Sequence, residues 1–210
     1  MSSAEHTFSV GAVILAAGRS ARMGQPKLLL PWGETTVLGH LIRQWQALGA
    51  TQTAVVCAAG DVTIRAEMGR LGFPADNGIS NPAPERGMFS SIQCAAEWAG
   101  WQEGITHWAI VLGDQPHLRI ETLRTLLDFG AAHPERVCQP AHGGHRRHPV
   151  LLPRGIFPAL STSTAATLKE FLNAQPVASC PVDDPGLDVD LDRPEDYRQA
   201  LRSCAPGQGG

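Results

Sequence analysis

Short apolar segments alternate with amphipathic segments along most of this chain, and this alternation constrains the fold more than any other feature. Apolar runs rich in β-branched residues predict buried strands at 10–15, 53–57, 107–112, 137–139, 149–152 and 187–191. Helical spacing of apolar residues, or a proline start, predicts helices at 37–48, 87–98, 120–129, 164–172 and 194–201. Strands apolar on both faces that alternate with helices indicate a three-layer α/β/α fold around a mostly parallel sheet.

The overall composition is typical of one globular domain. The chain has 210 residues, 43% of them apolar, and a net charge of −3. We expect a single domain over 1–204 and a flexible tail over 205–210. Because no long basic run is present, nucleic acid is disfavoured as a partner. The five cysteines form no C-x-x-C pair, and no apolar run reaches transmembrane length. We therefore expect a cytoplasmic protein without a membrane partner.

The loop after the first predicted strand has the composition of a phosphate-binding loop. It reads AAGRSARMGQPK over 16–27, and its small residues let backbone N–H groups approach a phosphate closely. Arg19, Arg22 and Lys27 bring three positive charges without one acidic residue. The loop is neither a G-x-x-x-x-G-K-[ST] nor a G-x-G-x-x-G motif, which disfavours a dinucleotide-dependent oxidoreductase. The alternative is an ordinary basic surface turn.

Acidic residues follow two of the predicted strands. Asp114 comes directly after 107–112, and Asp188, Asp190 and Asp192 alternate with apolar residues near the C-terminus. At strand period these three carboxylates would project from one face, where a cation could relieve their repulsion. Mg²⁺ favours one or two carboxylates together with phosphate oxygens. The alternatives are that Asp114 caps the next helix and that the C-terminal acids lie on an edge strand facing water.

Two middle segments are less informative on their own. The segment 81–92 is a proline-rich loop entering a helix, where a serine is usually a cap. Cys138, His142, His145 and His148 have side chains that suit zinc, but their spacing matches no structural zinc pattern. We interpret that stretch as a polar loop.

The first loop resembles a known signature. LAAGRSARMGQPK is similar to the L-A-[AG]-G-x-S-x-R-M-G-x-x-K pattern of the molybdenum-cofactor cytidylyltransferases and guanylyltransferases. The resemblance implies a Rossmann-like fold of the nucleotide-diphospho-sugar transferase type, and Arg19, Lys27 and Asp114 as catalytic residues. It also implies a set of nucleotide-binding residues: Leu15, Ala16, Ala17, Gly18, Arg19, Lys27, Asn81, Gly87 and Ser91.

Three further segments carry the same resemblance. GDQP resembles the family's G-D-x-P, and DVDLDRPEDY its D-I-D-T-P-E-D, which implies Mg²⁺ on Asp114 and Asp190, with Asp192 or Asp188 as alternatives to Asp190. NPAPERGMFSSI resembles N-P-x-x-x-G-M-x-S-S-L, the source of the residues at 81, 87 and 91. HRRHPV resembles R-G-H-P-V and implies that Arg146 and His148 bind the acceptor. The family's G-D-x-G-A-R is replaced by LSTSTAATLKEFL.

The resemblance implies a Mg²⁺-dependent nucleotidyltransferase. The LAAG form, in which the Ala17 methyl group narrows the pocket, favours CTP over GTP as donor. The acceptor would be a phosphorylated small molecule such as molybdopterin, and a molybdoenzyme or a maturation chaperone is a candidate partner. The alternatives are another acceptor, such as methylerythritol phosphate or a sugar phosphate, GTP as donor, and a non-catalytic nucleotide-binding protein that delivers a cofactor.

Overall fold

The computed structural model describes residues 8–18 and 23–204. Within them, one sheet runs in the order β10-β7-β9-β6-β1-β4-β5, and β8 pairs with β7. Its strands are β1 (Val10–Leu15), β4 (Gln52–Ala58), β5 (Gly78–Asn81), β6 (His107–Leu112), β7 (Val137–His142), β8 (His145–Arg146), β9 (Val150–Pro153) and β10 (Val177–Pro181). A separate small hairpin joins β2 (Pro31–Trp32) to β3 (Thr35–Thr36). In the large sheet, neighbouring strands are parallel, except that β9 is antiparallel to β6 and β7, and β8 is antiparallel to β7.

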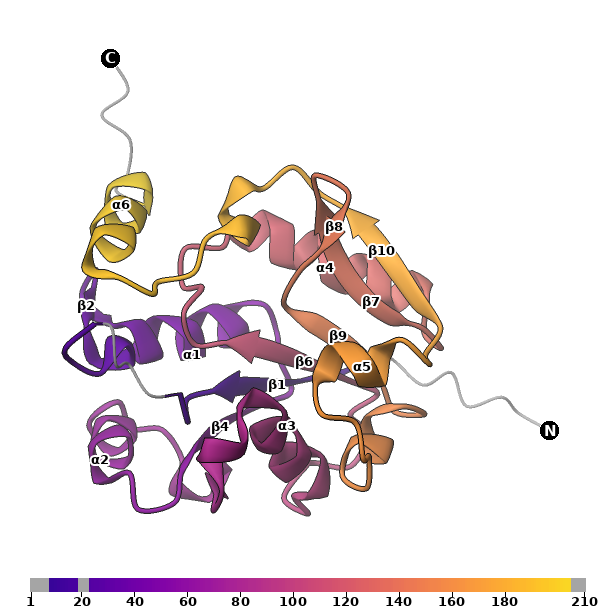
Figure 1. The fold of residues 1–210 in the computed structure, drawn as a ribbon, viewed down its shortest axis with the longest axis horizontal. Helices are drawn as coiled ribbons and strands as arrows, with labels where there is room; N and C mark the ends of the chain where they lie inside the picture. The colour runs from indigo at the N-terminus through magenta and orange to yellow at the C-terminus, as the bar shows by residue number, and fades with distance from the viewer. Residues whose placement is uncertain (1–7, 19–22, 205–210) are drawn as a thin grey trace.

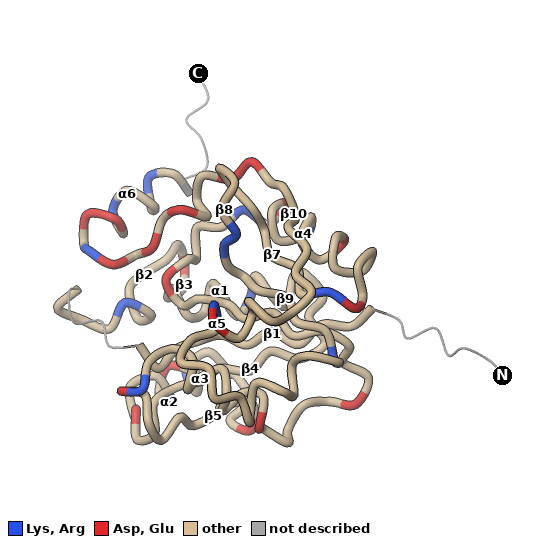
Figure 2. The backbone as a smooth tube through the Cα atoms, turned by 45° about the vertical axis from the view of Figure 1, so that its right-hand side comes forward, with Lys and Arg blue, Asp and Glu red and all other residues tan. Residues whose placement is uncertain are grey.

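Helices cover both faces of the sheet (Figure 1). They are α1 (Val37–Ala47), α2 (Val62–Arg70), α3 (Met88–Glu97), α4 (Ile120–Ala132), α5 (Leu168–Leu172) and α6 (Pro194–Cys204). Short 3₁₀ helices are η1 (Lys27–Leu29), η2 (Ala75–Asn77), η3 (Pro84–Arg86), η4 (Phe157–Leu160) and η5 (Pro185–Asp188). Basic and acidic residues are interspersed along the chain (Figure 2). The predicted α/β/α architecture is confirmed.

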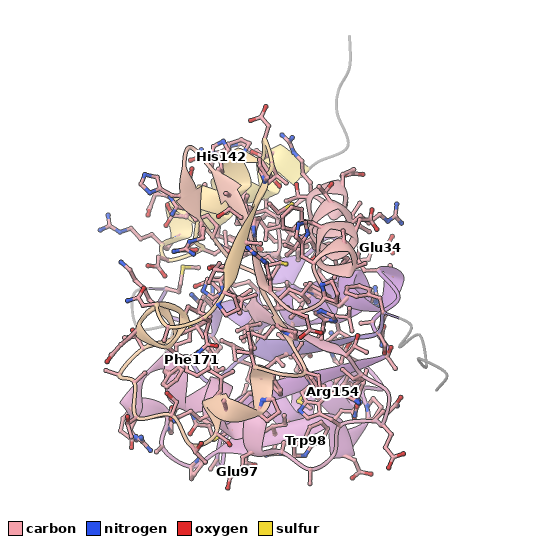
Figure 3. The ribbon with its side chains drawn as sticks, turned by 90° about the vertical axis from the view of Figure 1, so that its right-hand side faces the viewer. Glu34, Glu97, Trp98, His142, Arg154 and Phe171 are labelled. Carbon is pink, nitrogen blue, oxygen red and sulfur yellow. The ribbon has the colours of Figure 1, made fainter. Side chains whose placement is uncertain are left out.

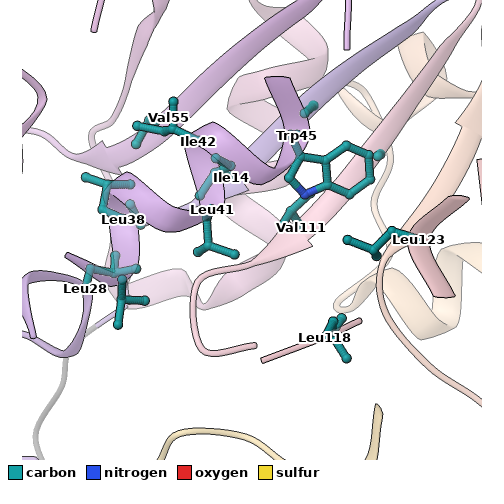
Figure 4. Packing of buried hydrophobic residues seen from close by; sticks show 14 of the residues in the cluster. Ile14, Leu28, Leu38, Leu41, Ile42, Trp45, Val55, Val111, Leu118 and Leu123 are labelled. Atoms are coloured by element: carbon teal, nitrogen blue, oxygen red, sulfur yellow. The ribbon is translucent and has the colours of Figure 1, made fainter. Parts of the chain in front are cut away.

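Alternate side chains of β1 divide the core in two. Ile14 joins the cluster that packs under α1 and α4, where Leu41 and Trp45 are each 1% exposed (Figure 4). Val13 joins the cluster under α3 and α5, which includes Ile92. Because both faces of the central strands are buried, these strands read as continuous apolar runs in the sequence. The β8 hairpin, with His142, lies at one end of the molecule, and Trp98 lies near the opposite end (Figure 3).

The predicted elements nearest the sheet centre match the structure. The strands at 10–15 and 107–112 have the predicted bounds, and α1 begins at Val37. Thr36 caps α1 because its hydroxyl accepts a hydrogen bond from the Gly39 N–H. In the described part of the chain, every helix is too short or too polar to cross a bilayer. The expected tail at 205–210 lies outside the described residues.

Two predicted elements are corrected. The segment 187–191 is not a strand: η5 occupies Pro185–Asp188, and an irregular segment follows. The reason is local, since the Asp184 side chain accepts from the Gly186 N–H and turns the chain at Pro185. The helix at 164–172 is shorter than predicted and begins only at Leu168, where Thr167 caps it. The elements α2, β5 and β10 were not predicted.

Candidate functional site

The site lies where β1 and β6 end. These strands are parallel neighbours, and Leu15 is paired with Leu112, so the loops that follow them meet at one edge of the sheet. Gly113 makes this approach possible, because a Cβ there would lie 2.6 Å from the Leu15 carbonyl oxygen. Asp114, the next residue, therefore lies near Ala17 and Gly18, which follow β1.

Lys27 and Asp114 form an ion pair at this edge. Lys27 opens η1, and its Nζ lies 2.6 Å from Asp114 Oδ2 and 3.5 Å from Asp192 Oδ1. The Lys27 and Asp114 side chains are only 17% and 21% exposed. Partial burial makes the interaction stronger than that of a surface pair. One ammonium group thus bridges carboxylates that are 78 positions apart in the chain, at 114 and 192.

Asp190 lies beside this pair. The Leu191 N–H donates to the Asp114 carbonyl oxygen at 3.0 Å, and the Gln115 side-chain amide donates to Asp190 Oδ1 at 2.9 Å. Burial raises the pKa of Asp190 above its ordinary value, and the neighbouring Asp114 carboxylate raises it further. The structure therefore gathers acidic side chains at 114, 190 and 192 around Lys27.

Lys27 and Asp114 line a pocket of about 490 Å³, a volume suited to a small-molecule ligand, whereas Asp190 and Asp192 are not among its lining residues. Four separate segments contribute to it, including Lys27 and Asp114 on one side and the start of α3 on the other. Its lining consists of Leu15, Ala17, Gly18, Lys27, Leu28, Pro84, Glu85, Gly87, Met88, Ser91, Leu112, Gly113 and Asp114. Main-chain loops and mixed polar and apolar side chains thus meet in one hollow.

Asn81 organises the α3 side of the pocket from beneath. It is 1% exposed, and its amide donates to the Ser90 and Ser91 hydroxyls at 2.9 Å each. Its side-chain oxygen accepts from the Ala83 N–H at 2.8 Å. Gly87 precedes α3 with a φ of 89°, a conformation that favours glycine. Gly87 and Ser91 line the pocket, whereas Asn81 is not among its lining residues.

His148 lies near enough to Asp114 for the carboxylate to affect its pKa. Burial lowers its pKa below the ordinary value, an effect opposed by a hydrogen bond to the Ile110 backbone and by the charge of Asp114. Its Nδ1 is buried and makes no hydrogen bond to the described part of the chain. Arg146 is exposed on β8. Of the two predicted acceptor residues, only His148 is therefore held against the acidic group.

Asp188 has different partners. Its carboxylate accepts from His142 Nδ1 at 2.8 Å and from Arg147 Nε at 2.6 Å. The hydrogen bonds from His142 and Arg147 lower the pKa of Asp188. The Asp188 side chain is therefore paired with the β7–β8 hairpin region and not with the group around Lys27, which leaves Asp190 and Asp192 beside Asp114.

The family follows from comparison with known proteins. Residues 12–180 match the MobA-like NTP transferase domain. The chain belongs to this family. It is a nucleotidyltransferase, as the motifs predicted.

Individual relatives are similar to this nucleotidyltransferase over most of its length. The molybdenum cofactor cytidylyltransferase of Escherichia coli K12 is 23% identical over 190 residues, which cover 90% of this chain and 94% of that protein. The crystal structure of Rv0371c from Mycobacterium tuberculosis H37Rv is 28% identical, with a TM-score of 0.74 and coverage of 93% and 98%. A structure of Rv0371c in complex with manganese is 27% identical, with a TM-score of 0.69 and coverage of 93% and 99%. These likenesses confirm the Rossmann-like fold.

The remaining residues predicted to bind the nucleotide do not all line the pocket. Leu15, Ala17 and Gly18 line the pocket, but Ala16 is buried, and its N–H donates to the Val56 carbonyl oxygen. Arg19 lies outside the described residues. Sequence reasoning missed Gln115, although it directly follows Asp114 in the motif.

A larger hollow, of about 1010 Å³, lies between α1, η5 and α6. It is lined by residues such as His40, Arg43 and Arg119 and contains neither Lys27 nor Asp114. Size alone would point to this hollow, but the nucleotidyltransferase motifs meet at the smaller one. We therefore place the candidate site at the 490 Å³ pocket.

Proposed function

We propose that this nucleotidyltransferase transfers CMP from CTP to the phosphate group of a small-molecule acceptor of the molybdopterin type, releasing pyrophosphate. The observation that carries this proposal is the ion pair of Lys27 and Asp114 in the lining of a 490 Å³ pocket, with Asp190 close to both side chains. The likeness to the molybdenum cofactor cytidylyltransferase of Escherichia coli supports the choice of donor and acceptor.

The pocket would hold the nucleotide. Ala17 and Gly18 line it with little side-chain bulk, so the backbone can come close to phosphate oxygens. The Ala17 methyl group narrows the pocket and favours a pyrimidine base. Ser91 and the N–H groups at the start of α3 supply polar contacts on the opposite wall. The motif adds Arg19 as a second cation for the triphosphate.

A divalent cation, which we propose to be Mg²⁺, fits the acidic side chains. Asp114 raises the pKa of Asp190, so a cation between the two carboxylates would relieve a repulsion present in the protein itself. Asp114 and Asp190 would hold the ion, with Asp192 nearby. When bound, such a cation neutralises phosphate charge and makes the α-phosphorus more electrophilic. The manganese complex of Rv0371c supports a divalent cation in this fold.

The chain's own groups would then position the reactants. An acceptor phosphate oxygen attacks the α-phosphorus, and the bond from that phosphorus to the oxygen bridging to the β-phosphorus breaks. A phosphate nucleophile is already ionised near neutral pH, so no general base is required. Lys27 would stabilise the negative charge that develops on the leaving pyrophosphate. His148, whose pKa is lowered by burial, would donate a hydrogen bond to the acceptor phosphate, and the exposed Arg146 would add a positive charge.

Pyrophosphate release from CTP or GTP, with Mg²⁺ and a panel of phosphorylated acceptors, tests the proposal. We expect release with CTP and molybdopterin, and a fall in kcat on the order of 100-fold or more for Asp114→Asn. Asp128→Asn, an exposed carboxylate on α4, is the matched control. Tight binding of CTP and Mg²⁺ without release from any acceptor would instead favour a cofactor-delivery protein. Release with methylerythritol phosphate alone would replace the acceptor.

A further inference from the structure

The β7–β8 hairpin has a defined shape. Its two-residue turn, Gly143–Gly144, has φ values of 56° and 81°, which suit a type I′ turn. Ala141 pairs with Arg146, and the Arg147 N–H continues the pairing by donating to the Pro140 carbonyl oxygen at 2.8 Å. The hairpin is therefore one hydrogen-bonded unit, and its pairing extends to Arg147, the residue before His148.

The segment with the acidic residues is anchored on both sides of Asp190. Leu187 is 1% exposed and Leu191 is fully buried. The Leu191 N–H donates a hydrogen bond to the Asp114 carbonyl oxygen. Asp184, at the start of η5, accepts a hydrogen bond from the Thr122 hydroxyl at 2.7 Å. Asp190 thus lies on a short connection whose position depends on η5.

A side-chain cluster joins these two units. Asp188, the last residue of η5, accepts from Arg147 through one carboxylate oxygen and from His142 through the other. Figure 3 shows His142 at the end of the molecule where the hairpin lies. Arg147 stands between Arg146 and His148, and Asp188 lies two residues before Asp190. Arg147, His142 and Asp188 form what we call the clasp.

The clasp is too exposed to be a main source of stability. The side chains of Arg147 and Asp188 are 33% and 40% exposed, and exposed ion pairs contribute little to folding. Its geometry is nevertheless specific, because each carboxylate oxygen accepts from a different donor, one before and one after the hairpin turn. A weak but directional connection of this kind suits positioning better than support of the fold.

We propose that the clasp is a positioning device that couples the acceptor side of the site to the metal-binding aspartates. This inference rests on the proposed function. When the acceptor's phosphate binds beside His148, the clasp holds η5 in place, and Asp190 is oriented for the cation. Binding of the acceptor phosphate and binding of the cation with CTP then favour each other, and linkage requires that each strengthens the other by the same factor. Arg147 and Asp188 are positioning residues and do not contact the reacting atoms.

Binding measurements on the full chain test this coupling. Calorimetry would measure the Kd of a non-hydrolysable CTP analogue in the presence of Mg²⁺. Each measurement would be made with and without inorganic phosphate, which substitutes for the phosphate of the acceptor. We expect phosphate to tighten analogue binding about fivefold to tenfold in the wild type and by less than twofold in Asp188→Asn or Arg147→Gln. The double variant should lose no more coupling than either single variant. In turnover assays of Asp188→Asn and Arg147→Gln, we expect the KM for the acceptor and the Mg²⁺ concentration that gives half-maximal activity to rise severalfold. The KM for CTP should change less.

Asp183→Asn is the matched control. Asp183 lies in the same cluster but is fully exposed, and it reaches His142 only at 3.7 Å. The charge exchange Arg147→Asp with Asp188→Arg should restore part of the coupling. Coupling in Asp188→Asn and Arg147→Gln that equals the wild-type value, with unchanged thermal stability, would overturn the inference while leaving the proposed function intact. A wild type that binds no CTP analogue with Mg²⁺ would overturn both.

Discussion

The charge balance around Asp190 explains why a single lysine matters at this site. Burial and the Asp114 carboxylate both raise the pKa of Asp190, and the Lys27 ammonium group opposes them. Lys27 also lies within 4 Å of carboxylates at 114 and 192. Because the Lys27 ammonium group is already held among carboxylates in the folded protein, it is positioned to stabilise the negative charge of a bound phosphate as well.

Asn81 should matter for stability more than for direct nucleotide contact. Replacing it with alanine leaves the half-buried Ala83 N–H without its acceptor and removes both hydrogen bonds that the Asn81 amide donates to Ser90 and Ser91. We expect Asn81→Ala to lower the free energy of unfolding by about 2–3 kcal/mol, measured by urea denaturation. Asn173→Ala, an exposed asparagine, is the control. Unchanged stability with a large loss of CTP affinity would place Asn81 on the nucleotide instead.

At the scale of elements, prediction succeeded where burial imposed a pattern. β1 and β6 are buried on both faces, and their apolar runs define their ends. β5 has the sequence GISN, in which Ile79 is the only strongly apolar side chain, so periodicity could not detect it. The alternating acids at 188–192 imitated a strand, but Asp184 and Pro185 set the backbone there. Local turn chemistry outweighed the pattern.

The hydrogen bonds that Glu67 forms between α1 and α2 should make the free energy of unfolding depend on pH. Glu67 on α2 accepts from Arg70 at 2.7 Å through both oxygens and from the Thr36 hydroxyl, the α1 cap, at 2.6 Å. The Arg70 hydrogen bonds are the main reason that the pKa of Glu67 lies below its ordinary value. A depressed carboxyl pKa stabilises the fold above the unfolded value, near pH 4.3, and this contribution is lost as pH falls through the folded value.

Glu67→Gln should therefore be less stable than the wild type at pH 7, and the difference should shrink steadily below about pH 4. Urea denaturation of both proteins across that range measures it. Glu195→Gln, which loses an exposed pair with Arg198 at 3.7 Å, should show no such dependence. A difference between Glu67→Gln and the wild type that stays constant with pH would assign the effect to packing and not to charge.

At the scale of the whole molecule, the sequence predicted which loops meet but not how each residue takes part. Parallel strands with their carboxyl ends at one edge make the meeting of Lys27 and Asp114 foreseeable from order alone. Asn81, however, braces the pocket wall from beneath, and Asp188 turns toward Arg147. Those distinctions depend on side-chain directions set by distant contacts, which a one-dimensional pattern does not contain.

Ligand binding should stabilise the molecule as a whole, because the pocket joins segments from residue 15 to residue 114. A ligand at 100 times its Kd adds about 2.7 kcal/mol, which for a chain of this length raises Tm by about 5–10 °C. We expect this shift with CTP and Mg²⁺, a smaller one with GTP and Mg²⁺, and a smaller one with CTP when EDTA removes the metal, all followed by thermal denaturation. ATP at the same concentration is the second purine control. A shift with GTP that matches CTP would contradict the donor assignment, since the narrowing by Ala17 would then not select the base. An equal shift with EDTA would mean that Lys27 and the loop hold the triphosphate without help from Asp114 and Asp190.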